Sequence, residues 1–144
     1  MSVIDKLNRE YRKVKSIDLT NNTSLVLGRI VVSGTIAMDT NGLYTIITVP
    51  APYYFEPHLV KFRQTGGVAT SDMTASCGTG AGANDIFTAT PFVGIRNIND
   101  LWMYPIAGKV KRCAPGDVIS WNISTFCTGT LPIGEATLYG ELTV

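Results

Sequence analysis

The residues that could do chemistry in this chain are few, and its single histidine, His58, is the first to consider. One histidine excludes a multi-histidine metal site and leaves one candidate general base for a hydrolase. No GxSxG motif supplies a nucleophile beside it, and Pro57-His58 at the start of an expected strand is typical of a turn. We therefore expect no catalytic residue, no bound metal and no enzyme activity, and a hydrolase dependent on His58 is the last alternative.

A glycine-rich segment superficially matches a dinucleotide-binding turn. Gly78, Gly80 and Ala83 have the GxGxxA spacing that lets backbone amides approach a pyrophosphate. That fingerprint requires a helix opening at the third position, whereas residues 84–88 predict a strand. The sequence therefore favours a structural role for these glycines, and we expect no cofactor.

The carboxylates and cysteines do not form a recognisable metal motif either. Four aspartates lie scattered through expected turns, without the regular spacing of a calcium-binding loop, although a calcium ion between subunits stays an alternative. None of the three cysteines belongs to a CxxC motif or a Cys/His cluster. We expect free thiols that are mostly buried, at Cys77, Cys113 and Cys127.

Positive charge is concentrated at the N-terminus, although the net charge of the chain is only +1. Five basic residues lie in the first fifteen: Lys6, Arg9, Arg12, Lys13 and Lys15. A near-neutral chain has no general field that would steer it to nucleic acid or an acidic membrane, so we expect neither partner. Any contact with an acidic surface would be made by this segment.

The same segment has the pattern of an amphipathic helix. Ile4, Leu7, Tyr11 and Val14 recur at spacings of three and four, and Ser2 with Asp5 matches a capping box. So short a helix is marginal in water by itself and must dock on something. We divide the chain into an arm, 1–15, and a domain, 16–144. The arm either folds on its own domain or engages other chains.

Two further clusters are candidates for contacts. Lys109, Lys111 and Arg112 alternate with Val110, which favours an edge strand whose charges either prevent strand pairing or contact an acidic partner. Three consecutive aromatic residues, Tyr53, Tyr54 and Phe55, lie in a proline-rich segment, 50–57, that predicts a crossover loop or edge segment. The three rings are interpreted as a subunit contact or a plug in the end of the domain, with a sugar-stacking platform as the alternative.

The elements that carry these residues are predicted to be strands. Apolar residues make up 45% of the chain and charged residues only 16%, which indicates surface hidden in contacts with other chains. Strict alternation predicts strands at 119–124 and 136–144, the latter in the core. Further strands are expected at 24–32, 43–49, 59–65, 85–90 and 101–104, with Asn41-Gly42 joining the first two as a hairpin. Over residues 66–84 we expect either strand fragments through Val68–Cys77 or a long loop or flexible hairpin.

About eight strands in one domain predict an all-β, antiparallel, jelly-roll-like β-sandwich with a short N-terminal helical arm. The glycine-, alanine- and threonine-rich residues 79–85, the Pro115-Gly116-Asp117-Val118-Ile119 entry into a strand, and the terminal strand 136–144 resemble the small jelly-roll cement or decoration proteins of tailed-phage capsids. The resemblance covers roughly residues 43–144 and rests on a pattern of turns and strands.

The resemblance implies a structural virion protein on the outer surface of a phage capsid, assembled as a homotrimer and bound to the major capsid protein. The arm residues Ile4, Leu7, Arg9, Tyr11 and Arg12 would contact the capsid, with Tyr53, Tyr54 and Phe55 between subunits. The alternatives are a carbohydrate-binding module or tail-fibre component, and a shell-forming coat protein whose basic arm binds packaged nucleic acid. We expect no signal peptide and no membrane-spanning helix.

Overall fold

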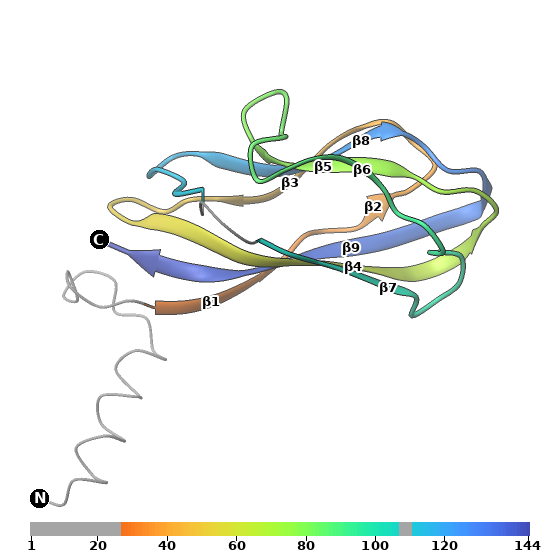
Figure 1. The fold of residues 1–144 in the computed structure, drawn as a ribbon, viewed down its shortest axis with the longest axis horizontal. Helices are drawn as coiled ribbons and strands as arrows, with labels where there is room; N and C mark the ends of the chain where they lie inside the picture. The colour runs from red at the N-terminus through yellow and green to blue at the C-terminus, as the bar shows by residue number, and fades with distance from the viewer. Residues whose placement is uncertain (1–26, 107–110) are drawn as a thin grey trace, which may run out of the picture.

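The computed structural model describes residues 27–106 and 111–144, and all of its regular elements are β-strands. They form two facing antiparallel sheets, seen as the upper and lower layers of Figure 1. The strands are β1 Leu27–Val32, β2 Ile36–Ala37, β3 Gly42–Thr48, β4 Tyr54–Ala69, β5 Thr74–Thr79, β6 Phe87–Pro91, β7 Leu101–Pro105, β8 Val118–Thr125 and β9 Gly129–Thr143.

The order of the strands is that of a jelly roll. One sheet runs β1-β9-β4-β7, with β2 also paired to β9, and the other runs β3-β8-β5-β6. Strands from the two ends of the chain pair in turn, β1 with β9, β3 with β8, β4 with β7 and β5 with β6. This pairing is a long antiparallel ribbon rolled into two sheets. The β-sandwich expected from the sequence is confirmed.

The core lies between the sheets and is rich in aromatic side chains. Trp121 of β8 is fully buried, stacks on Phe62 of β4 with ring centroids 5.1 Å apart, and meets Phe92 edge to face at 5.0 Å. Phe92 in turn stacks on Trp102 of β7 at 4.0 Å. Offset-stacked and edge-to-face pairs contribute beyond the area they bury, so these rings hold the two sheets together.

The two strands predicted from alternation have the predicted faces. Ile119 and Ile123 of β8 point inward with Trp121, and Ala136, Leu138 and Leu142 of β9 are buried. β9 is also longer than expected, because it begins at Gly129 and pairs with β1, β2 and β4. The prediction that the last strand belongs to the core is therefore confirmed.

The predicted hairpin is wrong. β1 and β3 lie in different sheets, where β1 pairs with β9 and β3 pairs with β8. Asn41-Gly42 does lie between strands, but the chain uses that bend to cross from one sheet to the other. A turn signal is local, whereas the choice of partner strand depends on residues about one hundred positions away.

For two segments the sequence left strand open as one alternative, and both contain strand. The proline-rich segment 50–57 already contains the start of β4 at Tyr54, with Pro57 beside a register shift where its missing donor is tolerated. The small-residue segment 66–84 contains the end of β4 and the whole of β5. The predicted arm, 1–15, lies outside the described residues. No helix of the described residues is long and apolar enough to cross a membrane.

Candidate interaction surfaces

The aromatic triplet is divided between the core and the surface. Tyr53 and Phe55 are 1% and 0% exposed and belong to the core of their own domain. Tyr54 points the other way, and the guanidinium of Arg112 lies over its ring, 4.0 Å from the centroid. Since neighbouring residues of a strand point to opposite faces, the triplet cannot form a continuous exposed platform. Of the three rings, Tyr54 is the one that can contact another molecule.

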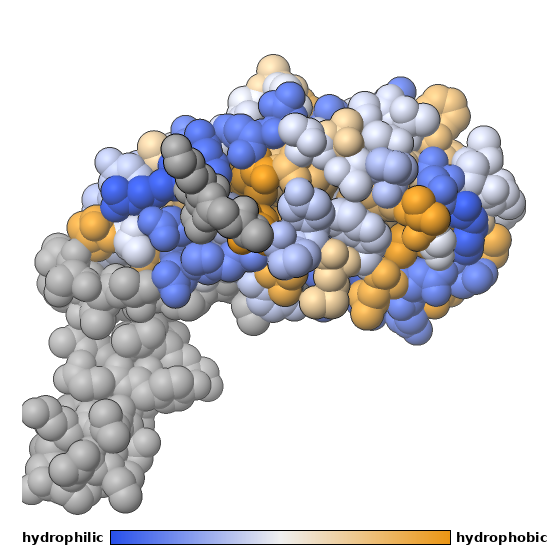
Figure 2. All heavy atoms as spheres, in the orientation of Figure 1, coloured by the Kyte–Doolittle hydropathy of each residue, from blue (hydrophilic) through white to orange (hydrophobic). Residues whose placement is uncertain are grey.

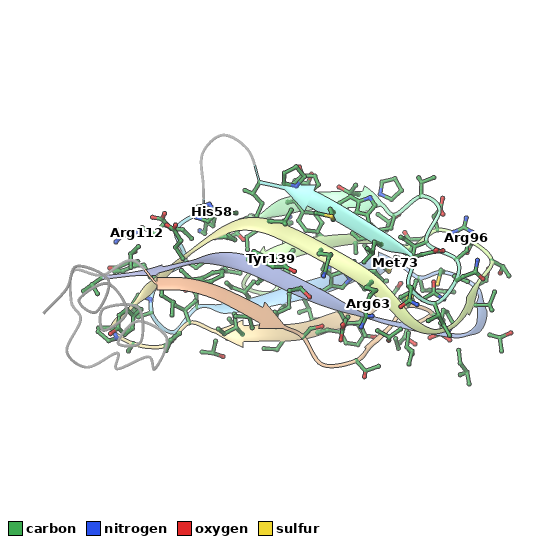
Figure 3. The ribbon with its side chains drawn as sticks, turned by 90° about the horizontal axis from the view of Figure 1, so that it is seen from below. His58, Arg63, Met73, Arg96, Arg112 and Tyr139 are labelled. Atoms are coloured by element: carbon green, nitrogen blue, oxygen red, sulfur yellow. The ribbon has the colours of Figure 1, made fainter. Side chains whose placement is uncertain are left out.

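The outer face of the β1-β9-β4-β7 sheet carries charged side chains in pairs, and we call it the charged face. Arg63 of β4 donates to Glu135 of β9 at 2.9 Å, and the Nζ of Lys61 lies 5.8 Å from the ring centroid of Tyr139. Figure 3 looks onto this sheet and shows His58 and Arg112 toward one end and Arg63 and Arg96 toward the other. At this second end Arg96 binds Asp72 at 2.6 Å. Arg63 and Arg96 are therefore already paired with carboxylates of the same domain.

The basic cluster predicted at residues 109–112 is also largely neutralised. Lys111 lies 3.2 Å from Asp85, and Arg112 lies 3.7 Å from Glu56, while Lys109 is outside the described residues. Partial burial tends to raise the pKa of Asp85, but hydrogen bonds from the Thr79 backbone N–H and hydroxyl and the charge of Lys111 outweigh it, so the pKa is lowered. The same contact raises the pKa of Lys111. These residues tie the turn after β5 to the segment before β8.

The outer face of the other sheet is formed by strands without charged residues, and we call it the uncharged face. The sequences of β3, β5, β6 and β8 contain no Asp, Glu, Lys or Arg. Between the inward residues of β8, the outward positions are Val118, Ser120 and Asn122, and Leu43 of β3 lies opposite Asn122. Leu43 and Val118 are 49% and 40% exposed. Solvent-facing sheets usually carry charges that oppose unwanted pairing, so this face has the composition of a surface that is covered in an assembly.

The edge strand β7 forms a third surface, which we call the apolar edge. In the described residues β7 pairs only with β4, and its side chains alternate. Trp102 and Tyr104 turn toward Phe87 in the core, whereas Leu101 and Met103 are 52% and 56% exposed on the side of the charged face. Figure 2 shows hydrophobic side chains gathered in a band on the face viewed, toward the end where β7 begins. The strand predicted at 101–104 is confirmed, and it lies at a sheet edge.

The cysteine thiols of the domain are buried and protonated. The three cysteines are free and buried, as expected. Burial raises the pKa of the Cys113 thiol to about 12 and raises that of Cys77 well above its usual value, so both are neutral at physiological pH. Gly78 lies within β5 and Gly80 in the turn after it, and the next element is the strand β6 rather than a helix. The predicted arm contacts, Ile4, Leu7, Arg9, Tyr11 and Arg12, lie outside the described residues.

Comparison with known proteins shows that the fold of this chain is similar to folds in solved structures. No protein-family model matches the chain, and no curated protein matches it in sequence. Among solved structures, the chain is similar to one in the acidic stable capsid of Helicobacter pylori bacteriophage KHP30, with a TM-score of 0.56 and 13% identity, covering 83% of this chain and 94% of that one. It is also similar to a chain of the cyanophage Pam1 capsid asymmetric unit, with a TM-score of 0.55 and 9% identity, covering 81% and 85%.

A coat protein of Tobacco streak virus gives a weaker match, with a TM-score of 0.36 and 18% identity. The similarity of fold is therefore taken from the two phage capsid chains. Both extend over most of each chain, so the likeness includes both sheets rather than one motif. The fold of this protein is one that occurs in chains of phage capsids.

Proposed function

We propose that this protein is a structural component of a virion, a cement or decoration protein that binds the outer surface of a phage head and stabilises the shell through noncovalent contacts. The observation that carries the proposal is the fold shared with 94% of one phage capsid chain and 85% of another.

The surfaces of the domain support assembly with copies of itself. The uncharged face and the apolar edge lie on opposite sides of the sandwich, since Leu43 and Val118 point out from one sheet and Met103 points out from the other. A contact between the uncharged face of one copy and the apolar edge of the next is heterologous. Heterologous contacts close into rings when the rotation allows it, and a homotrimer is the smallest such ring. Tyr54 would lie at the rim of the subunit contact.

The arm, 1–15, would then bind the major capsid protein. Its basic and apolar residues suit an acidic groove on a shell, and one trimer would present three arms to a repeating lattice. Linked weak contacts bind far more tightly than one contact alone, because the second and third become intramolecular. The mechanism is therefore a multivalent clamp that needs no chemical step.

The carbohydrate-binding alternative loses its main support. It depends on an exposed platform of Tyr53, Tyr54 and Phe55, and two of these rings are in the core. A shell-forming coat protein with the same fold is the alternative that an experiment must separate from a cement protein.

The test uses particles of the virus whose genome encodes this sequence, produced with and without the gene. A cement protein predicts that particles lacking the chain still assemble, lose their DNA at a lower temperature, and regain stability when the purified full chain is added. DNA release on heating, followed with an intercalating dye, measures this. Failure of any shell to assemble would instead identify a coat protein, and absence of the chain from normal particles would refute a virion role.

A further inference from the structure

Two carboxylates face each other toward one end of the charged face. Glu56 of β4 and Glu141 of β9 are direct partners in the antiparallel register. Like charges directly opposite in a sheet are destabilising, so such a pair requires a compensating positive charge. The register shifts between Pro57 and Leu59, and this irregularity adds His58 to the same neighbourhood.

The three side chains converge without bonding to one another. One donor atom from each of Glu56, His58 and Glu141 lies within 4.8 Å of the others. The Nε2 of His58 is 3.6 Å from the Oε2 of Glu141, and the Nε of Arg112 is 3.7 Å from the Oε1 of Glu56. Both distances exceed that of a hydrogen bond.

The other ion pairs of the described residues differ from this group. Arg63 and Glu135, on the same two strands, are 2.9 Å apart, and the pairs at Arg96 and Lys111 are 2.6 Å and 3.2 Å long. Those carboxylates lie within hydrogen-bonding distance of a cation, whereas among the described residues no hydrogen bond reaches the carboxylate oxygens of Glu56 or Glu141. Arg112 offsets the charge of Glu56 from 3.7 Å without a direct hydrogen bond, while its guanidinium rests on the Tyr54 ring.

We infer that Glu56, His58 and Glu141 form a binding site for a divalent transition-metal cation of the zinc class. An imidazole nitrogen with two carboxylate oxygens is a donor set for Zn²⁺, at bond lengths of about 2.0–2.2 Å. Ligand atoms at those bond lengths lie about 3.4 Å from one another around a tetrahedral ion. Side-chain movements of about 1 Å therefore bring the three donor atoms into coordinating positions. The nitrogen donor disfavours Ca²⁺ and Mg²⁺, which take oxygen ligands.

The inferred metal site is open to solvent. The side chains of His58 and Glu141 are 44% and 43% exposed, so a bound ion keeps positions open to water or to a ligand from a neighbouring molecule. The charge of Arg112 opposes the ion and keeps the affinity modest. The site stands independently of the proposed virion role, because it needs only the described domain.

The experiment is titration of the full chain with Zn²⁺ by calorimetry, with Co²⁺ absorption spectra to report nitrogen and oxygen ligands. We expect one ion per chain in the wild type and at least ~10-fold weaker binding in His58→Gln and in Glu141→Gln. Glu135→Gln is the matched control, since it removes a carboxylate from the same face of the same strand, and it leaves binding unchanged. Arg112→Gln tightens binding. Thermal unfolding of each variant without metal checks that the domain is intact.

Zinc that binds equally well after His58→Gln and Glu141→Gln would overturn the inference, since the ion would then lie elsewhere, for example on cysteine thiolates. Absence of binding by the wild type at about 1 mM Zn²⁺, a concentration that detects even a weak site, would overturn it as well. A Co²⁺ spectrum with the intense absorption of thiolate ligation would do the same. None of these results bears on the stability of the virus particles.

Discussion

Replacing both Leu43 and Val118 by lysine tests whether the uncharged face is covered by a neighbouring copy. The two side chains project from adjacent strands, β3 and β8, and are 49% and 40% exposed. In an isolated domain the change exchanges two exposed apolar groups for two solvated cations and has little effect on stability. In an assembly that covers this face it places two charges inside a contact.

The magnitude follows from the area of the face and the exposure of the two residues. The face is four strands wide and, at β8, 8 residues long. With strands about 4.8 Å apart and a rise of about 3.3 Å per residue, its area is about 500 Å². A contact that covers it buries about 1,000 Å² in total, at the lower limit for a specific interface.

Two half-exposed residues therefore contribute a large share of the binding. Fully burying a Leu or Val side chain contributes about 1.5–3 kcal/mol, so covering the exposed part of both contributes about 1.5–2.5 kcal/mol. Losing that term weakens association about 10- to 60-fold, and desolvating two lysines weakens it further.

Sedimentation equilibrium of the full chain over a range of concentrations measures the effect. We expect the double variant to be monomeric where the wild type is oligomeric, with an unchanged thermal unfolding midpoint. Val93→Lys is the control, since Val93 is 71% exposed in the connection between β6 and β7, outside the four strands of the uncharged face, and it leaves association unchanged. Equal association of the double variant and the wild type would refute the reasoning, and so would a wild type that stays monomeric at the highest concentration.

Two further predictions concern the domain itself. Phe55→Ala should lower the free energy of unfolding by about 3–5 kcal/mol because the ring is fully buried, whereas Tyr54→Ala should change it by much less. Urea denaturation measures both changes. Equal effects of the two substitutions would contradict the placement of Phe55 in the core and Tyr54 at the surface. Asp85 has a lowered pKa in the folded state, so its contribution to stability is present above about pH 4, the usual value for aspartate, and is lost as the pH falls through the lowered value. Thermal unfolding of Asp85→Asn should therefore depend less on pH below about pH 4, and an unchanged dependence would show that other groups dominate acid unfolding.

Alternation in the sequence was sufficient to predict which strands carry the core. The period of two in β8 and β9 depends only on the residues of each strand, because every second side chain of a strand faces the same way. The same rule explains Tyr53, Tyr54 and Phe55, whose alternation between core and surface was hidden by the prolines around them. The free buried cysteines followed equally from composition and spacing.

The tertiary structure alone decided which strands became neighbours and which side chains met. Asn41-Gly42 indicated a turn correctly, but not that β1 would pair with β9, since pairing depends on residues distant in sequence. Glu56 and Glu141 are 85 positions apart by their numbers and face each other only because β4 and β9 are neighbours in one register. The uncharged face likewise exists only because four strands without charge were collected into one sheet. Local periodicity is a property of each segment, whereas a surface or a site belongs to the sheet that brings distant segments together.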